Sequence, residues 1–123
     1  MKKAVLVLMA VLLLTATCWA QGMTPKGKDI TMTGMLSCTF CNLPAAGGKC
    51  SKECCQACIK SGDPALLSDA KGTLYVLLSG EHEKPLMTPD KMALVNEKIT
   101  VTGILVKRGG LQAIYVKKME KAK

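Results

Sequence analysis

The sequence predicts one mainly β domain with short helices (α+β): a small closed or partly open barrel that carries a cysteine-rich helical insert. Three observations support this fold class. The chain has 123 residues, a length suited to a single core. Several segments alternate apolar and hydroxyl side chains with the period of two that is typical of strands. Six of the seven cysteines lie at positions 38–58, in a segment with few large apolar side chains, so the insert needs support beyond hydrophobic packing.

The first twenty residues have the composition of a secretory leader. Two lysines precede an apolar run at 4–14, and small and polar residues lead to Ala20. This run of about eleven residues is shorter than the roughly twenty that cross a bilayer as a helix. We therefore predict a signal peptide at 1–20 and export to the periplasm or beyond the cell. The alternatives are an uncleaved anchor and a lipid attached to Cys18.

Removal of this leader changes the balance of the chain. The net charge falls from +8 to +6, and the cysteine count falls from seven to six, an even number. Disulfides persist in exported proteins, so pairing of the six cysteines becomes feasible.

The low aromatic content of 3% disfavours nucleic-acid sites, which stack bases on several aromatic rings. A weak contact between the lysine-rich C-terminus and an anionic membrane surface remains an alternative.

Two segments of the exported part match each other, at 30–36 and 99–105, with five of seven positions identical. Their alternation predicts two strands, each with one apolar face. Gly34 and Gly103 lie inside these strands, where a glycine indicates a bulge or a bend. The residues expected on the apolar faces are Ile30, Met32, Ile99 and Val101.

Shorter signals predict the remaining elements. Ser51 suits an N-cap and Gly62 a stop, which predicts a helix at 52–60. The apolar run at 73–78 follows a Lys-Gly turn and predicts a central strand. A further helix should begin at Thr88-Pro89 and bury Met92, Ala93 and Val95. The pair Gly109-Gly110 predicts a hairpin to a strand at 111–116, and the lysine-rich end at 117–123 is expected to be a solvated tail.

This order of strand, cysteine-rich insert, strand, short helix, strand, hairpin and strand is similar to the OB-fold over residues 28–119. The Val-Thr-Gly pattern at 101–103 also resembles strands of small exported bacterial OB-fold proteins. The resemblance implies one more strand, for which part of 42–50 or of 79–86 is the candidate. The predicted organisation is a signal peptide at 1–20, a flexible segment at 21–28, one domain at 29–119 with its insert at 37–62, and a basic tail at 120–123.

The first interpretation of the insert is a metal site. Two C-x2-C pairs separated by thirteen residues could converge on one tetrahedral ion, as zinc sites require. Six thiolates within 21 residues would equally suit Cu(I) or another soft metal. Cys54 could also replace Cys55 as a ligand. The predicted ligands are Cys38, Cys41, Cys55 and Cys58, with Cys50 and Cys54 as accessories.

Two other interpretations stay open. Three disulfides could staple the insert, and the barrel would then be a module that binds a protein or a small ligand. Alternatively, the pair Cys55 and Cys58 at a helix start could be a thiol-disulfide redox centre, although the chain lacks the βαβ pattern of thioredoxin-like proteins. Neither C-x-x-C pair is followed by histidine, so no covalent haem is expected. No glycine-rich phosphate loop precedes a helix, so no nucleotide is expected either.

The remaining candidate ligand is His82, the only histidine, in a polar loop. It is expected to be solvent-exposed, although a histidine with the thioethers of Met87 and Met92 would suit copper. One histidine and scattered acids give no catalytic arrangement. The sequence therefore favours an exported, non-enzymatic protein that binds zinc or another thiophilic metal.

Overall fold

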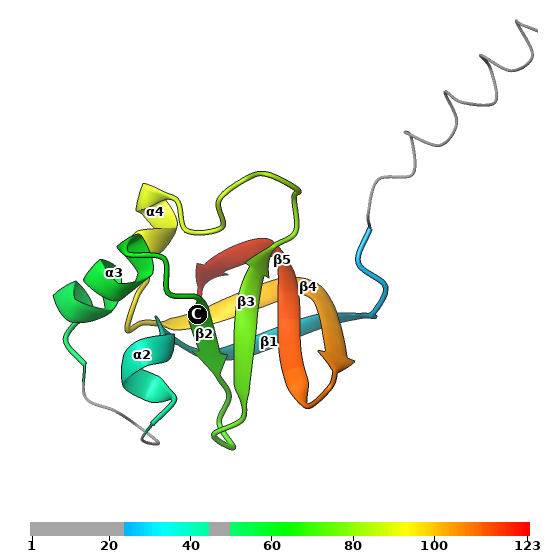
Figure 1. Ribbon diagram of the computed structural model, residues 1–123, viewed down its shortest axis with the longest axis horizontal. Helices are drawn as coiled ribbons and strands as arrows, with labels where there is room; N and C mark the ends of the chain where they lie inside the picture. Colours follow the sequence, from blue (N-terminus) through cyan, green and yellow to red (C-terminus); the bar gives the residue numbers. More distant parts are fainter. Residues whose placement is uncertain (1–23, 45–49) are drawn as a thin grey trace, which may run out of the picture.

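The computed structural model describes residues 24–44 and 50–123, and within them five strands close into a barrel (Figure 1). The predicted signal peptide and Cys18 lie outside the described residues. Neighbouring strands are antiparallel except for one parallel pair, β3 with β5. The order around the barrel is β1-β2-β3-β5-β4. The strands are β1 (Lys28–Cys38), β2 (Ala65–Ser68), β3 (Leu74–Ser79), β4 (Lys98–Arg108) and β5 (Leu111–Lys121).

Three short helices lie together on one side of the barrel (Figure 1). The insert between β1 and β2 contributes two of them, and the third lies between β3 and β4, where the resemblance to the OB-fold places a helix. The predicted fold class, a small α+β barrel with a helical insert, is thus confirmed. The helices are α2 (Thr39–Asn42), α3 (Lys52–Lys60) and α4 (Pro89–Met92).

The two matching segments are hydrogen-bonded partners in the barrel wall. Met32 lies opposite Val101 in the antiparallel pair of β1 and β4. On the outer face, the hydroxyls of Thr31 and Thr102 hydrogen-bond at 3.2 Å, and a second threonine pair repeats this contact one step along. On the inner face Val101 is fully buried. The shared pattern therefore encodes one wall with an apolar inside and a hydroxyl ladder outside.

The glycines in these strands mark close approaches of the backbone. The register between β4 and β5 shifts at Thr102/Gly103, as the prediction of a bulge requires. A Cβ atom at Gly103 would lie 2.1 Å from the carbonyl oxygen of Tyr115. At Gly34 it would lie 2.4 Å from the carbonyl oxygen of Ser68, near the point where β1 begins to pair with β2. No larger residue fits either position without moving the neighbouring strand.

Several expectations about individual elements are wrong. The missing strand is β2, at Ala65–Ser68, rather than part of 42–50 or 79–86. Its four residues are too few to display alternation, and three of them are buried. The end predicted as a solvated tail instead continues β5 to Lys121, because Met119 is buried in the core. Of the face predicted for α4, Val95 is buried, but Ala93 is exposed because the helix ends at Met92.

Candidate metal centre

The six insert cysteines come from four consecutive pieces of backbone. Cys38 is the last residue of β1 and pairs with Ala65, so it lies inside the barrel wall rather than just past it. Cys41 lies in α2, a helical turn that the sequence did not predict, and Cys50 precedes α3. The other three, Cys54, Cys55 and Cys58, lie on α3.

The local sequence of α3 fixes where its cysteines point. Ser51 is the predicted N-cap, and its hydroxyl oxygen accepts a hydrogen bond of 3.1 Å from the backbone N–H of Cys54. The helix ends before Gly62, whose φ of 112° is a left-handed conformation. With the helix start fixed, Cys55 faces the core and is fully buried, whereas Cys54 is exposed.

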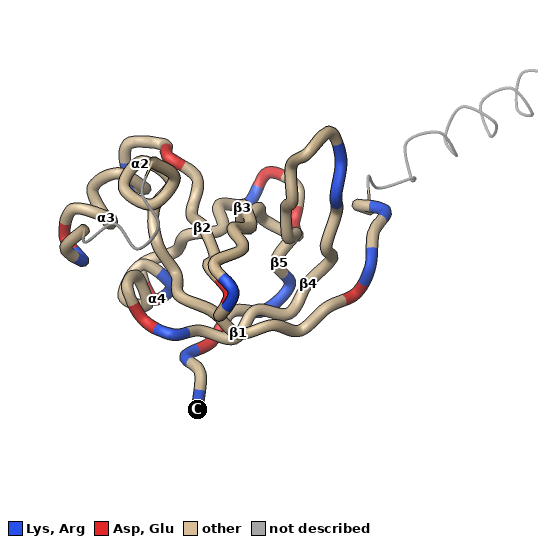
Figure 2. The backbone as a smooth tube through the Cα atoms, turned by 90° about the horizontal axis from the view of Figure 1, so that it is seen from below, with Lys and Arg blue, Asp and Glu red and all other residues tan. Residues whose placement is uncertain are grey.

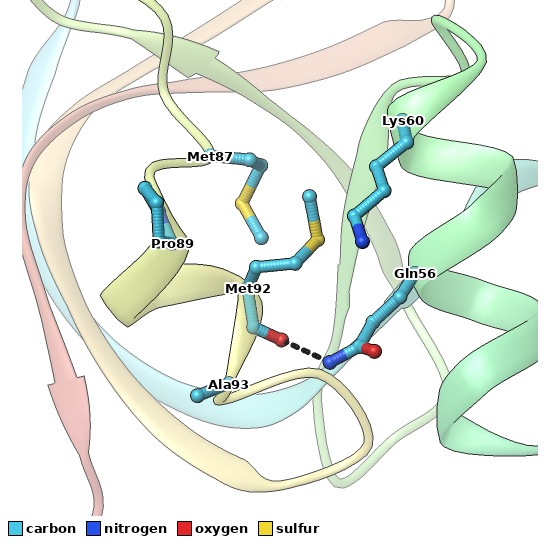
Figure 3. A pocket seen from close by; sticks show the side chains of 6 residues that line it. All are labelled: Gln56, Lys60, Met87, Pro89, Met92 and Ala93. Atoms are coloured by element: carbon cyan, nitrogen blue, oxygen red, sulfur yellow. Dashed lines mark hydrogen bonds between the residues drawn. The ribbon is translucent and has the colours of Figure 1, made fainter.

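Two polar side chains that the sequence analysis overlooked hold the insert in place. The amide of Asn96, which lies just before β4, donates a 2.8 Å hydrogen bond to the carbonyl oxygen of Cys50. The amide of Gln56 on α3 donates a 2.8 Å hydrogen bond to the carbonyl oxygen of Met92 (Figure 3). Asn96 adopts a φ of 62°, and Asn tolerates this region better than most residues. In the sequence, the only indication of this role was that Asn96 lies between a predicted helix and a predicted strand.

The sulfurs of the six cysteines, all free thiols, lie close together. The Sγ atoms of Cys41 and Cys50 are 2.9 Å apart, and those of Cys38 and Cys55 are 3.1 Å apart. Three triads have all their sulfurs within 4.8 Å of one another. These triads are Cys38, Cys50 and Cys55; Cys38, Cys41 and Cys58; and Cys41, Cys50 and Cys54. A cluster of this shape could hold metal.

The predicted ligands are distributed over these triads. Cys38, Cys41 and Cys58 form one triad, and Cys55 joins Cys38 in another. The predicted accessories are as close to the other sulfurs as the predicted ligands are, since Cys50 belongs to two triads. The spacing of the C-x2-C pairs therefore located the cluster, but it gave no reason to set two of the six thiols apart.

Crowding raises the pKa of most of these thiols. Hydrogen bonding with Cys50, burial and the neighbouring Cys38 raise the pKa of Cys41 to about 12. Burial, followed by the effect of Cys38, raises the pKa of Cys55 and that of Cys58 to about 11. These groups are therefore neutral at pH 7, and a metal ion would have to displace their protons.

The pKa values of Cys50 and Cys38 shift in opposite directions. A hydrogen bond with Cys41 lowers the pKa of Cys50, but Cys54, burial and Cys55 together raise it to about 12. Burial acts to raise the pKa of Cys38, yet hydrogen bonds from Cys55 and Cys41 outweigh it, and its pKa is lowered. Cys38 is thus easier to ionise than an isolated cysteine, because its neighbours donate hydrogen bonds to its thiolate.

His82 and the two methionines lie in different places. The His82 side chain is 76% exposed and lines a cavity with Tyr115 and Lys117. Met87 and Met92 instead line a cavity of about 420 Å³ between α4 and α3, with Gln56 and Lys60 across from them (Figure 3). Among the described residues, His82 joins none of the groups that could hold an ion.

Comparisons with protein-family models, curated proteins and solved structures found no match to this chain. In the part of the chain that the structure describes, no helix is long and apolar enough to cross a membrane.

Proposed function

We propose that this chain is an exported, non-enzymatic protein that binds zinc or another thiophilic metal through its insert cysteines. The observation that carries the proposal is the convergence of six thiols into three triads whose sulfurs lie within 4.8 Å of one another. Thiolates are the preferred ligands of zinc and of soft metals such as Cu(I). On this proposal the barrel is a scaffold that fixes the distance between β1 and α3.

The burial of the sulfurs fits an ion that is shielded from solvent on one side and can enter the cluster from the other. Cys38 and Cys55 are fully buried on the barrel side of the cluster, whereas Cys54 is exposed on the other side. A metal would enter past Cys54 and settle against the buried pair. Its positive charge would also favour thiolates over the thiols that burial and sulfur–sulfur hydrogen bonds keep protonated.

The thiol pKa values favour binding over redox catalysis. A redox C-x-x-C pair attacks through an accessible thiolate of low pKa. Cys55 and Cys58 both have a pKa raised to about 11, so neither is an effective nucleophile at neutral pH. Cys38 has a lowered pKa, but it is fully buried, and no substrate disulfide could reach it.

Surface charge gives no reason to invoke nucleic acid. Basic and acidic residues are spread around the molecule rather than gathered on one face (Figure 2). Among the described residues, five lysines make ion pairs with carboxylates on the protein surface. Exposed pairs of this kind contribute little to stability, yet they reduce the positive field that would attract a polyanion.

A second candidate is a disulfide-stapled barrel that binds a protein or a small ligand. The observation in its favour is the closeness of two sulfur pairs, Cys41 with Cys50 and Cys38 with Cys55. On this alternative these pairs would oxidise first, because bonding requires the least backbone movement. Exposed apolar side chains on the insert, Phe40 and Leu43, would then face a partner.

The two candidates differ in what purified protein contains. We would isolate the exported full chain without added metal, count reactive thiols after denaturation, and measure bound metals by elemental analysis. The metal proposal expects metal in the protein and at least four thiols once the metal is removed. No metal and no reactive thiol would contradict it and favour disulfides. Cys55→Ser should lower the metal content, whereas Cys18→Ser, which changes the predicted leader, should leave it unchanged.

A further inference from the structure

The three sulfur triads share members in a regular way. Cys38, Cys41 and Cys50 each belong to two triads, and every two triads have one of these three sulfurs in common. Each triad is completed by one sulfur that belongs to no other triad. The unshared sulfurs, all on α3, are Cys54, Cys55 and Cys58.

We propose that the insert holds three Cu(I) ions in one thiolate-bridged cluster, an inference that rests on the metal-binding function proposed above. One ion lies in each triad and has three sulfur ligands. Cys38, Cys41 and Cys50 each bridge two ions, so that metals and bridging sulfurs alternate around a six-membered ring. The three sulfurs of α3 each bind a single ion from outside this ring.

The coordination number favours Cu(I) over zinc. Three thiolates satisfy Cu(I), which is a soft ion that commonly adopts trigonal geometry with sulfur. Zinc sites are nearly always four-coordinate. Among the described residues, no histidine, aspartate or glutamate joins the triads to supply a fourth ligand. A zinc ion here would have to draw its four thiolates from more than one triad and leave the other sulfurs unused.

The distances require only a local adjustment. With a metal–sulfur bond of about 2.3 Å, the sulfurs of a trigonal site lie about 4 Å apart. Each triad already lies within 4.8 Å, and the sulfur pairs at 2.9 Å and 3.1 Å would separate by about 1 Å. Cys41 and Cys50 lie outside the strands, and Cys55 on α3 can move away from Cys38 while Cys38 keeps its pairing with Ala65 in β1.

Binding leaves the oxidation states unchanged. Three Cu(I) ions replace the six thiol protons, which pass to solvent, and the product carries a formal charge of −3. Six bare thiolates this close together would carry −6 and would repel one another strongly. The cluster therefore forms as ions and protons exchange, without prior ionisation of the thiols.

The test is a titration of the reduced full chain with Cu(I), without oxygen and against a competing Cu(I) chelator. Native mass spectrometry counts the bound ions, and X-ray absorption reports sulfur coordination and neighbouring copper atoms. The expected result is saturation at three ions per chain, with three sulfurs around each copper and a second copper atom close to it.

Saturation at one ion without a neighbouring copper atom would overturn the proposed cluster but leave the proposal of metal binding intact. No bound copper, zinc or other thiophilic metal would overturn both. A fourth ion would contradict the assignment of the three α3 sulfurs as single-ion ligands.

A pair of serine variants tests the sharing pattern itself. Cys50→Ser removes a sulfur common to two triads, so the chain should retain one Cu(I). Cys54→Ser removes a sulfur of one triad, so the chain should retain two. Cys54 is exposed, so its variant should fold, and Cys58→Ser, also expected to retain two ions, provides a second test at a half-buried site. Equal losses from Cys50→Ser and Cys54→Ser would overturn the bridged arrangement.

Discussion

Asn96 connects the barrel to the insert through both its backbone and its side chain. Its backbone N–H donates to the carbonyl oxygen of Leu36 at 2.8 Å, and its amide donates to the carbonyl oxygen of Cys50, also at 2.8 Å. One residue thus links the end of β1, the start of β4 and the start of the cysteine helix. The position of Cys50 depends on it, and Cys50 belongs to two of the three triads.

We predict that Asn96→Ala lowers the free energy of unfolding by about 2 kcal/mol, of which about half is the lost hydrogen bond and half the left-handed backbone. Asn96→Gly is the matched control, because glycine adopts a φ of 62° freely and loses only the side-chain bond. Urea denaturation of the metal-free, reduced chain measures both. Equal costs for the two variants would show that the backbone conformation contributes nothing.

The stability of the metal-free barrel should depend on pH through Asp69, and the pKa of Asp69 gives the direction of this dependence. Its carboxylate accepts hydrogen bonds from the backbone N–H groups of Thr73 and Lys71, both at 2.9 Å, and these bonds lower its pKa. A carboxylate with a lowered pKa in the folded state stabilises the protein above the unfolded-state value, about 4. That stability is lost as the pH falls below about 4 and through the folded-state pKa.

We therefore predict that Asp69→Asn is less stable than the unmodified chain at pH 7 and that the difference shrinks below about pH 4. Thermal unfolding of both chains from pH 2 to pH 7 measures this. A difference that stays constant over the whole range would mean that the charge of Asp69 does not stabilise the turn.

At the scale of single residues, the sequence predicted some roles and concealed others. Ser51 was recognisable as a cap because serine before a helical segment satisfies an otherwise unpaired N–H group. Asn96 was not, because its partner Cys50 lies 46 residues earlier in the chain. Local chemistry can be inferred from neighbours, whereas a long-range hydrogen bond depends on the folded arrangement.

At the scale of elements, the β4–β5 pair depends on an approach between strands that only glycine permits. We predict that Gly103→Ala lowers the free energy of unfolding by about 3 kcal/mol, since its Cβ atom would lie 2.1 Å from the carbonyl oxygen of Tyr115. Gly72→Ala is the control: its φ of 80° is left-handed, unlike that of Gly103, but a Cβ atom there meets nothing within 4 Å. It should cost only about 1 kcal/mol of backbone strain. Chemical denaturation that gave equal costs would contradict the steric explanation.

The elements that the sequence missed share a physical cause. The strand β2 has four residues, too few to establish a period, and α2 is a single turn that follows directly from β1. The longer strands and α3 were predictable because alternation, caps and turn glycines agreed over many residues. The end of β5 was predicted wrongly because exposed lysines surround its one buried residue, Met119, and give the segment the composition of a tail.

At the scale of the whole molecule, element order was enough to predict a barrel, but not the arrangement of its sulfurs. Two C-x2-C pairs predicted that the cysteines converge, since each pair lies on a short rigid segment. Which sulfurs meet depends on the angle between α3 and β1. That angle follows from buried contacts of Ile59 and Cys55 with the core, and spacing along the chain does not report it.

The barrel and the insert are stabilised by different interactions, so metal removal should affect them unequally. The strands are joined by long ladders, ten residue pairs between β4 and β5 alone, around a largely aliphatic core. The insert instead relies on its cysteines and a few hydrogen bonds, among them those of Gln56 and Asn96. We predict that removing bound metal under reducing conditions speeds amide hydrogen exchange in α2 and α3 and leaves β4 and β5 protected.

Hydrogen exchange measured by mass spectrometry on metal-loaded and metal-free protein tests this prediction. The variant Cys54→Ser, which keeps most ligands, should show a smaller change in exchange on metal removal. Equal loss of protection in the insert and the barrel would mean that the metal stabilises the whole fold, as in small domains that fold only around their ion.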